Sequence, residues 1–350
     1  MNLKSRYHRL FLIYKVAKKR KKSEFIGTFA VNINLKHKQL MQRKQTISTF
    51  YTDKQVCFDS IRERSYSQSP LKPYLLMQKI ERSEQQSNFE VHSDFPPFKQ
   101  EEFLLAHTEE YVSNFFNKTG NYQSNGIPWS ENLATSVTYT NSAIYHAIKH
   151  SLEHPDQLCF APVSGMHHAR PDSGQGFCTF SGQVIASLKL YDELGVSGAW
   201  LDLDGHFGNS IEDSRGFDPR INKAIPWDCN VNPIGYNEEY LQDFKFKLER
   251  VKRRILEGKV HYVVFAHGAD SHIDDDLGGQ CDTVHWLACA ELFSTWVNEV
   301  SLEIGKPLPV TLALFGGYRK DDYNIVLDLH LASVERCRSI MCEANEAQAA

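Results

Sequence analysis

Two acids and a histidine interrupt a stretch of sequence that otherwise has the pattern of a buried strand. In "AWLDLDGHFGN" (199–209), Asp202, Asp204 and His206 stand at alternate positions. Alternate residues of a strand project from the same face, so the three polar side chains are expected to point together, away from the leucines between them. A carboxylate and an imidazole two residues apart at a strand end can bind one cation. The spacing therefore predicts a metal site at the end of this strand.

Three further polar clusters follow strand-like segments in the second half of the chain. "LCFAPV" runs into "SGMHHARPDSGQGF", "VVFAHG" into "ADSHIDDDLGGQ", and "VTLALFGG" into Tyr318. Ligands of parallel sheets bind beyond the carboxyl ends of the strands, so all four clusters are expected to share one edge. A histidine pair is usually a surface feature and an aspartate after a strand is usually a helix cap. Four such clusters on one edge indicate an active site instead.

The residue types at this edge suit metal-assisted hydrolysis. Asp270 can add a third ligand to the acid and histidine of the first cluster, and three N/O ligands with one open position are typical of catalytic zinc. Such an ion lowers the pKa of bound water and polarises a carbonyl. His167 and His168 can serve as general base and acid. Tyr318 follows two glycines that let the backbone approach closely, and its hydroxyl can donate to an oxyanion.

Strand and helix patterns alternate from residue 155 onward and must position these clusters. Strands are expected at 158–163, 197–204, 260–268 and 307–317, and helices at 180–195, 237–258, 283–305 and 323–340. Before residue 155 the pattern is mostly helical and loop-like, with amphipathic segments at 75–83 and 142–154 and a first strand beginning at Phe50 and Tyr51. The alternation predicts an α/β fold: a single three-layer domain with a central, mainly parallel β-sheet flanked by helices.

Composition places the chain among soluble globular proteins. Of its 350 residues, 41% are hydrophobic and 23% charged, and no apolar run is long enough to span a membrane. The eight cysteines are scattered without a CxxC pair. This spacing argues against a disulfide framework or a cysteine-built zinc ribbon and is typical of the reducing cytoplasm, where we expect the protein.

Residues 1–46 are expected to form a flexible basic extension ahead of a folded domain at 47–345. Residues 1–50 carry 13 Lys/Arg and one acid, whereas the remainder carries 26 Lys/Arg and 42 Asp/Glu. "KKRKK" at 18–22 is compatible with nuclear import, an anionic-surface patch, a transit-like peptide or a mis-assigned start, and these alternatives stay open. The acidic remainder disfavours nucleic acid as a direct partner and is compatible with cationic substrates.

At the four clusters the sequence resembles the zinc-dependent histone deacetylase family, including its bacterial amidohydrolases, which has the arginase–deacetylase fold. "GMHHARPDSGQGFCTF" is similar to the family's His-His segment with Gly-Phe-Cys, and "LDLDGHFGN" to its Asp-x-Asp-x-His-His-Gly-Asp/Asn strand. "GADSHIDDDLGG" resembles the third-ligand loop, and "FGGYRKDDYNIVLDLH" the Gly-Gly-Gly-Tyr segment with the last helix. The resemblance runs from about residue 49 to 340, and the residues after 155 carry most of it.

The resemblance implies a metal centre and an electrophilic tyrosine. It makes Asp204, His206 and Asp270 the ligands of one Zn²⁺. It also implies a potassium ion held by backbone carbonyls around the 202–206 strand. Tyr318 would polarise the acyl carbonyl.

The histidine pair takes its roles from the same resemblance. His168 would take and return the proton, with His167 as its electrostatic neighbour. Asp202 would pair with His167, and Asn209 with His168. A neutral asparagine is expected to support a charged His168 less well than the aspartate of many members.

A substrate tunnel is implied as well, and here the chain departs from the family. Gly176 and Phe177 would grip an extended acyl-amine chain. The interval after His206, which usually brings the opposite aromatic wall, is shorter than in typical members, so that Phe217 or Trp227 serves instead or the tunnel is open on one side.

Four substitutions break the family pattern, and the early helix lacks an arginine often found there. The substitutions are Phe207 for the second histidine, Asn209 for aspartate, Asp276 for proline and Phe315 for the first of three glycines. None of them removes a reacting group. The arginine has no evident counterpart near Pro73.

The resemblance implies a zinc-dependent hydrolase that removes an acetyl or other short acyl group from an amine, with an acyl-lysine side chain of a protein or peptide as the first expectation. An acetylpolyamine or another small acyl-amine is the alternative substrate. A non-catalytic metal- or acyl-binding module on the same fold is a rival of another class, disfavoured because a binder needs no proton transfer. A dinuclear manganese hydrolase would need additional bridging carboxylates. The oligomeric state stays open.

Overall fold

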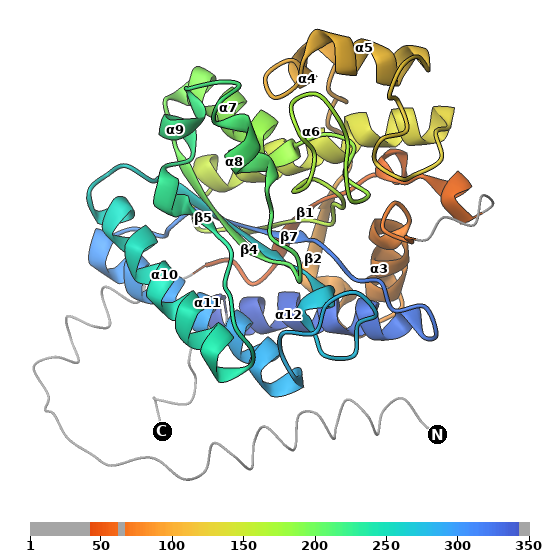
Figure 1. Cartoon of the computed structure of the whole chain (residues 1–350). Coiled ribbons are helices and arrows are strands. Elements are labelled where there is room, and N and C mark those ends of the chain that lie inside the picture. The colour runs from red at the N-terminus through yellow and green to blue at the C-terminus, as the bar shows by residue number, and fades with distance from the viewer. Residues whose placement is uncertain (1–42, 62–66, 343–350) are drawn as a thin grey trace, which may run out of the picture. The chain divides into compact units, whose positions relative to one another are not determined.

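Seven parallel strands form the central sheet, in the order β2-β1-β3-β7-β6-β4-β5 (Figure 1). The structure is a computed structural model and describes residues 43–61 and 67–342. The strands are β1 (Ile47–Phe50), β2 (Phe89–His92), β3 (Leu158–Ala161), β4 (Gly198–Leu203), β5 (Asn230–Val231), β6 (Tyr262–His267) and β7 (Val310–Leu314). Every pairing between neighbours is parallel, so all carboxyl ends meet at one edge.

Helices cover both faces of the sheet. They are α3 (Lys72–Glu81), α4 (Gln100–Phe103), α5 (Glu109–Asn117), α6 (Glu131–Glu153), α7 (Gly182–Leu194), α8 (Ser210–Ser214), α9 (Ile221–Ala224), α10 (Glu238–Leu256), α11 (Thr283–Ile304) and α12 (Tyr323–Met341). Figure 1 shows α6 and α7 on one side of the strands and α10, α11, α12 and α3 on the other. The predicted three-layer α/β fold is confirmed, and the sheet of the described residues is wholly parallel.

Burial explains why the central strands were readable as apolar runs. All residues of β3, β4, β6 and β7 are buried, as expected where helices cover both faces of a parallel sheet. The helices bury one stripe each: α10 places Tyr240, Phe244, Leu248, Val251 and Ile255 inward. The ends of α7 and α11 are set by glycines at φ 68° and 71°, a left-handed conformation that glycine adopts without steric cost.

The first strand differs from the expectation. It occupies Ile47–Phe50, so Phe50 ends β1 instead of beginning it. The polar residue Ser48 hid the apolar pattern of this strand in the sequence. Its hydroxyl is nevertheless buried, because it donates a 2.6 Å hydrogen bond to Gln157. Just before it, Arg43 is buried and donates to the carbonyls of Pro155 and Leu308.

Most of the predicted basic extension at residues 1–46 lies outside the part of the chain that the structure describes. Residues 1–42, with the basic run at 18–22, lie outside the described residues. All eight cysteines lie within them and are buried. No helix in the described part of the chain is long and apolar enough to cross a membrane.

Candidate active site

Four adjacent strands bring the predicted site residues to one edge of the sheet. β3, β7, β6 and β4 are neighbours in that order, and each continues at its carboxyl end into a polar loop. The loops carry His167, His168, Gly176 and Phe177 after β3, Tyr318 after β7, Asp270 after β6, and Asp204, His206 and Asn209 after β4, while Asp202 lies within β4. Residues more than 150 positions apart in the sequence are thereby gathered into one site.

Asp204, His206 and Asp270 form a group that can hold a metal ion. One ligand atom from each lies within 4.8 Å of the others. His206 Nδ1 lies 3.1 Å from Asp204 Oδ1 and 3.0 Å from Asp270 Oδ2. Asp270 Oδ1 is buried without a hydrogen-bond partner among the described residues. Two carboxylates and an imidazole are a donor set that zinc accepts, so the residues present fit such an ion.

Electrostatics at this group also favour a cation. Burial and the charge of Asp204 raise the pKa of Asp270 to about 8. Hydrogen bonds to Asp204 and Asp270 raise the pKa of His206 to about 10. The charge of His167 and a hydrogen bond from His206 outweigh burial and lower the pKa of Asp204, so that acid keeps its charge. Asp270 needs further positive charge beside it to ionise, and a divalent ion would supply that charge.

Glycines hold the backbone against the two acids. A Cβ on Gly268 would collide with Asp270 Oδ1, and a Cβ on Gly316 would collide with Asp270 Oδ2. The Gly316 N–H donates to Asp204 Oδ2 at 2.6 Å. Side chains at these glycines would displace the carboxylates, so the positions of Asp204 and Asp270 depend on the absence of a Cβ there.

The two histidines lie against each other with separate partners. Their ring centroids are 4.0 Å apart. His167 Nδ1 lies 2.9 Å from Asp202 Oδ2, and His168 Nδ1 lies 2.8 Å from Asn209 Oδ1. The structure thus brings together both pairs that the resemblance implied.

The two rings differ in their protonation state. Burial alone would lower the pKa of His167, but the charges of Asp204 and Asp202 outweigh it and raise that pKa to about 9. Burial and the charge of His167 lower the pKa of His168 to about 4. Near neutral pH His167 carries the proton, and His168 is neutral and free to accept one.

Tyr318 lines a hollow beside the metal-binding group, and Asp204 of that group lines it too. Its ring centroid is 5.7 Å from that of Phe177 and 6.1 Å from that of His206. Burial raises the pKa of Tyr318 well above its ordinary value, so the hydroxyl keeps its proton and can donate it. The hollow is lined by Ser69, Gly165, Met166, His167, Gly176, Phe177, Cys178, Asp204, Phe315, Gly316 and Tyr318.

Phe177 is presented to this hollow in an unusual backbone conformation. Its φ is +63°, in the left-handed region that residues other than glycine rarely adopt. Gly176 before it has φ +51°, and a Cβ there would lie 2.6 Å from the His168 ring. The Phe177 N–H donates to the Asn125 carbonyl at 2.9 Å, which holds the turn. Strained residues of this kind cluster at functional sites.

The second aromatic wall is not where the sequence suggested. Neither Phe217 nor Trp227 lines the hollow. Trp227 is 66% exposed, and the Arg215 guanidinium lies over its ring at 4.3 Å. The aromatic ring that faces Phe177 belongs to Tyr318.

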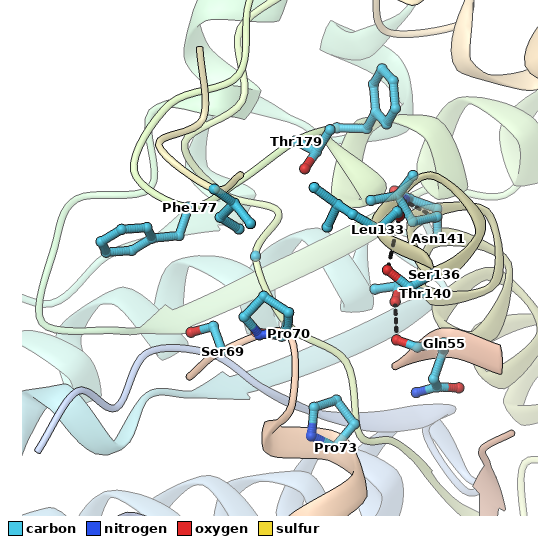
Figure 2. Close-up of a pocket in the computed structure, with 15 residues that line it drawn as sticks. Gln55, Ser69, Pro70, Pro73, Leu133, Ser136, Thr140, Asn141, Phe177 and Thr179 are labelled. Carbon is cyan, nitrogen blue, oxygen red and sulfur yellow. Dashed lines mark hydrogen bonds between the residues drawn. The ribbon is translucent and has the colours of Figure 1, made fainter. Parts of the chain in front are cut away.

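A second pocket adjoins the first behind Phe177. The two share Ser69, Gly165 and Phe177 as lining residues. Figure 2 shows Ser69 and Phe177 at one end and Gln55, Ser136, Thr140 and Asn141 at the other. The Thr140 hydroxyl donates to the Gln55 carbonyl at 3.1 Å, one of several polar groups in this wall.

Sequence reasoning missed a buried cation beside the site. The Lys72 ammonium is fully buried and donates to the Phe315 carbonyl. Burial lowers its pKa to about 8 against the pull of Asp270 and Asp204. No arginine was found near Pro73, and the structure places this lysine there instead. The available signal was a lysine between prolines in the apolar segment "SPLKPYLLM".

Sequence reasoning also missed the residue that anchors Tyr318. The Tyr318 N–H donates to Asp275 Oδ2 at 2.7 Å, across 43 residues. Asp276, next to it, accepts from the Lys320 N–H at 3.0 Å. Asp275 and Asp276 therefore hold the loop that follows the two glycines and carries Tyr318.

Replacing Asp275 with alanine is expected to lower kcat about tenfold for any reaction that uses the Tyr318 hydroxyl, because a hydrogen bond to a charged group contributes roughly 1.5–3 kcal/mol and part is recovered from water. Steady-state kinetics measure the effect. Asp276→Ala is the matched control, since it removes a similar contact from Lys320 and leaves Tyr318 anchored. Equal loss in both variants would show that general loosening of the loop is responsible.

Comparison with known proteins points to one family. Residues 67–224 match the family model of the histone deacetylase domain. This range contains the histidine pair, Asp202, Asp204 and His206, and it ends before Asp270 and Tyr318.

The curated relatives are distant. Histone deacetylase HDA1 of Candida albicans is 28% identical over 136 residues, which cover 35% of this chain and 16% of that protein. HDA1 of Saccharomyces cerevisiae is 25% identical over 226 residues, covering 52% and 31%. Histone deacetylase 8 of Xenopus laevis is 26% identical over 94 residues, covering 27% and 29%. Each match spans less than a third of the relative's length.

Among solved structures, the HD domain of HDA15 shares the fold. The two superpose with a TM-score of 0.64 over 85% of this chain and 88% of that one. Their sequences are 14% identical, so the likeness shows the fold and no more.

Proposed function

We propose that this chain, a relative of the histone deacetylases, is a zinc-dependent hydrolase that removes an acetyl or other short acyl group from an amine. One observation carries the proposal. Three metal-binding side chains lie together at the edge of the sheet, and the ring of one of them, His206, lies 6.0 Å from that of the neutral His168 and 6.1 Å from that of the protonated Tyr318. Asp204 and Tyr318 also line one hollow. Amide hydrolysis requires these functions: an electrophile for the carbonyl, a base for water and an acid for the leaving amine.

Asp204, His206 and Asp270 would hold the ion, which when bound polarises a carbonyl and lowers the pKa of water. His168 takes the proton from the attacking water as the new C–O bond forms. It returns that proton to the amine nitrogen as the C–N bond breaks. The Tyr318 hydroxyl donates a hydrogen bond to the carbonyl oxygen as negative charge develops there. His167 is already protonated and lies beside His168. Its positive charge disfavours the protonated form of His168, which therefore readily gives the proton on to the amine.

An acyl-lysine side chain is the substrate we propose first. The rings of Phe177 and Tyr318, in contact with centroids 5.7 Å apart, give the hollow an aromatic edge against which an extended apolar stem ending in an acyl group would pack. An acetylpolyamine would present a similar stem with further positive charges, which the acidic remainder of the chain also accommodates. The proposal extends to a potassium ion near the 202–206 strand and to a cytoplasmic location, with nuclear import through residues 18–22 as the variant of it.

Parallel turnover assays test the proposal. Zinc-loaded protein is given an acetyl-lysine peptide and acetylspermidine at matched concentrations, and free acetate is measured. The proposal predicts a higher kcat/KM for the peptide. Preference for acetylspermidine would move the substrate to small acyl-amines. Bound zinc without turnover of either would favour the non-catalytic binding module.

Restoring a carboxylate at position 209 is expected to move the acid limb of the pH–rate profile upward. The pKa of His168 is lowered to about 4, so the neutral base persists well below the pH at which an ordinary histidine protonates. A carboxylate beside Nδ1 favours the imidazolium, raises that pKa, and costs activity as the pH falls through the new value. Profiles of kcat against pH measure the shift.

The clean variant is the double substitution Asn209→Asp with Asp213→Asn. In Asn209→Asp alone, the new carboxylate would lie beside that of Asp213, whose Oδ2 is 2.7 Å from the present amide nitrogen, and the two acids would raise each other's pKa. Asp213→Asn alone serves as the reference. An acid limb that stays in place in the double variant would mean that position 209 does not tune His168.

A further inference from the structure

Asn209 lies between His168 and Asp213. Its Oδ1 is 2.8 Å from His168 Nδ1, and its Nδ2 is 2.7 Å from Asp213 Oδ2. The helix α8 creates this spacing, because Asn209 precedes its first residue and the Asp213 N–H donates to the Asn209 carbonyl at 2.9 Å. Residues four apart on a helix lie on one face, so the aspartate stands directly over the amide.

The acid determines which way the amide faces. A side-chain amide offers an oxygen that accepts and a nitrogen that donates, and the two ends can exchange by a half-turn. A carboxylate accepts only, so the Asn209 nitrogen must face Asp213 and the oxygen must face His168. A second acceptor on the nitrogen side, the His168 carbonyl, is more distant at 3.3 Å.

The amide in turn determines where His168 carries its proton. With an oxygen opposite it, Nδ1 has to be the donor, and the neutral ring then has its lone pair on Nε2. If the amide turned round, its nitrogen would face Nδ1, the proton would move to Nε2, and the base would be lost. A carboxylate at position 209 would accept from either direction, so the need for an outside anchor arises from the asparagine.

We propose that Asp213 is a positioning residue: it holds the Asn209 amide so that His168 keeps the tautomer whose Nε2 accepts a proton. Asp213 touches no reacting atom. It is itself held from the far side by Arg170, whose Nε lies 3.4 Å from Asp213 Oδ2. The catalytic meaning of the tautomer rests on the proposed function, while the orientation of the amide does not.

Solvent sets the size of the effect. The side chain of Asp213 is 37% exposed and that of Arg170 is 53% exposed, so water competes for both groups. Asp213→Ala is expected to lower kcat about fivefold and to leave KM near the wild-type value, since one partly exposed hydrogen bond is at stake.

Nitrogen NMR of the zinc-loaded, ¹⁵N-histidine-labelled protein tests the proposal, with the His168 signals assigned by their loss in His168→Ala. The proposal predicts the Nδ1–H form in the wild type and a shift toward Nε2–H in Asp213→Ala. Asp213→Asn is expected to give a result between the wild type and Asp213→Ala, because an amide at position 213 can turn either its oxygen or its nitrogen toward Asn209. Arg170→Gln removes the ion pair but leaves the Asp213 carboxylate, and is expected to keep the wild-type tautomer and kcat.

Two results would overturn the proposal: an unchanged tautomer in Asp213→Ala, or a loss in Arg170→Gln equal to that in Asp213→Ala, which would make the ion pair and not the acceptor responsible. The NMR readout needs no turnover. If the tautomer follows the prediction while the wild-type protein releases no acetate from any acyl-amine, the proposed function fails and the positioning role stands.

Discussion

Replacing His168 with alanine is expected to lower kcat for an acetyl-lysine peptide by about 10²–10⁴-fold, the usual contribution of a positioned general base and acid. The His168 ring lies 6.0 Å from that of the candidate ligand His206, and its Nδ1 is bound to Asn209, which leaves Nε2 for the proton of the attacking water. His167 cannot take over, because its pKa of about 9 keeps it protonated and Asp202 occupies its Nδ1. Steady-state kinetics and thermal unfolding are measured together.

A matched histidine elsewhere separates chemistry from stability. His146 lies on α6, partly buried against Phe95 and Tyr145, and belongs to no part of the proposed site. His146→Ala is expected to keep kcat near the wild-type value. Wild-type turnover by His168→Ala, with its folding intact, would contradict the assigned role of the base.

Replacing Tyr318 with phenylalanine is expected to lower kcat about 10²–10³-fold, the loss typical of removing one oxyanion donor. The substitution keeps the ring that packs against Phe177 and His206 and removes the hydroxyl alone. KM is expected to change little, because the hydroxyl contributes most when charge develops on the carbonyl oxygen. Kinetics with the acetyl-lysine peptide measure both constants.

Tyr145→Phe provides the comparison. Its hydroxyl bonds Glu193 at 2.5 Å on the helical layer of α6 and α7, away from the hollow. That variant is expected to turn over like the wild type. If Tyr318→Phe also did so, the oxyanion would have to be stabilised by other groups.

The central sheet was predictable because burial on both faces leaves a plain signature. The segments that became β3, β4, β6 and β7 are mostly apolar, and the polar residues within and after them stood out. The peripheral strands β2 and β5 carry no such signature. β2 has two exposed residues of four, and β5 is two residues long. Edge strands of this kind are decided by tertiary pairing rather than by local pattern.

The candidate ligands and the histidine pair were found from residue type and spacing, whereas their supports were not. Asp275 meets Tyr318, and Lys72 meets Phe315 across 243 residues. No local pattern encodes contacts at that separation.

The contact of Asp213 with Asn209 could have been predicted from the sequence. It lies four residues beyond Asn209, and recognising "SIEDS" as a helical turn would have placed the two side chains together.

Zinc titration into metal-stripped protein, followed by acetate release from an acetyl-lysine peptide, tests the central claim most directly. The account predicts that chelation abolishes turnover and that zinc restores it, with a plateau near one equivalent. Asp270→Asn keeps the size of the side chain but weakens the ligand set, so its turnover is expected to stay low at that equivalent. Turnover that survives chelation, or that zinc restores equally in Asp270→Asn, would contradict a reaction built on these three side chains.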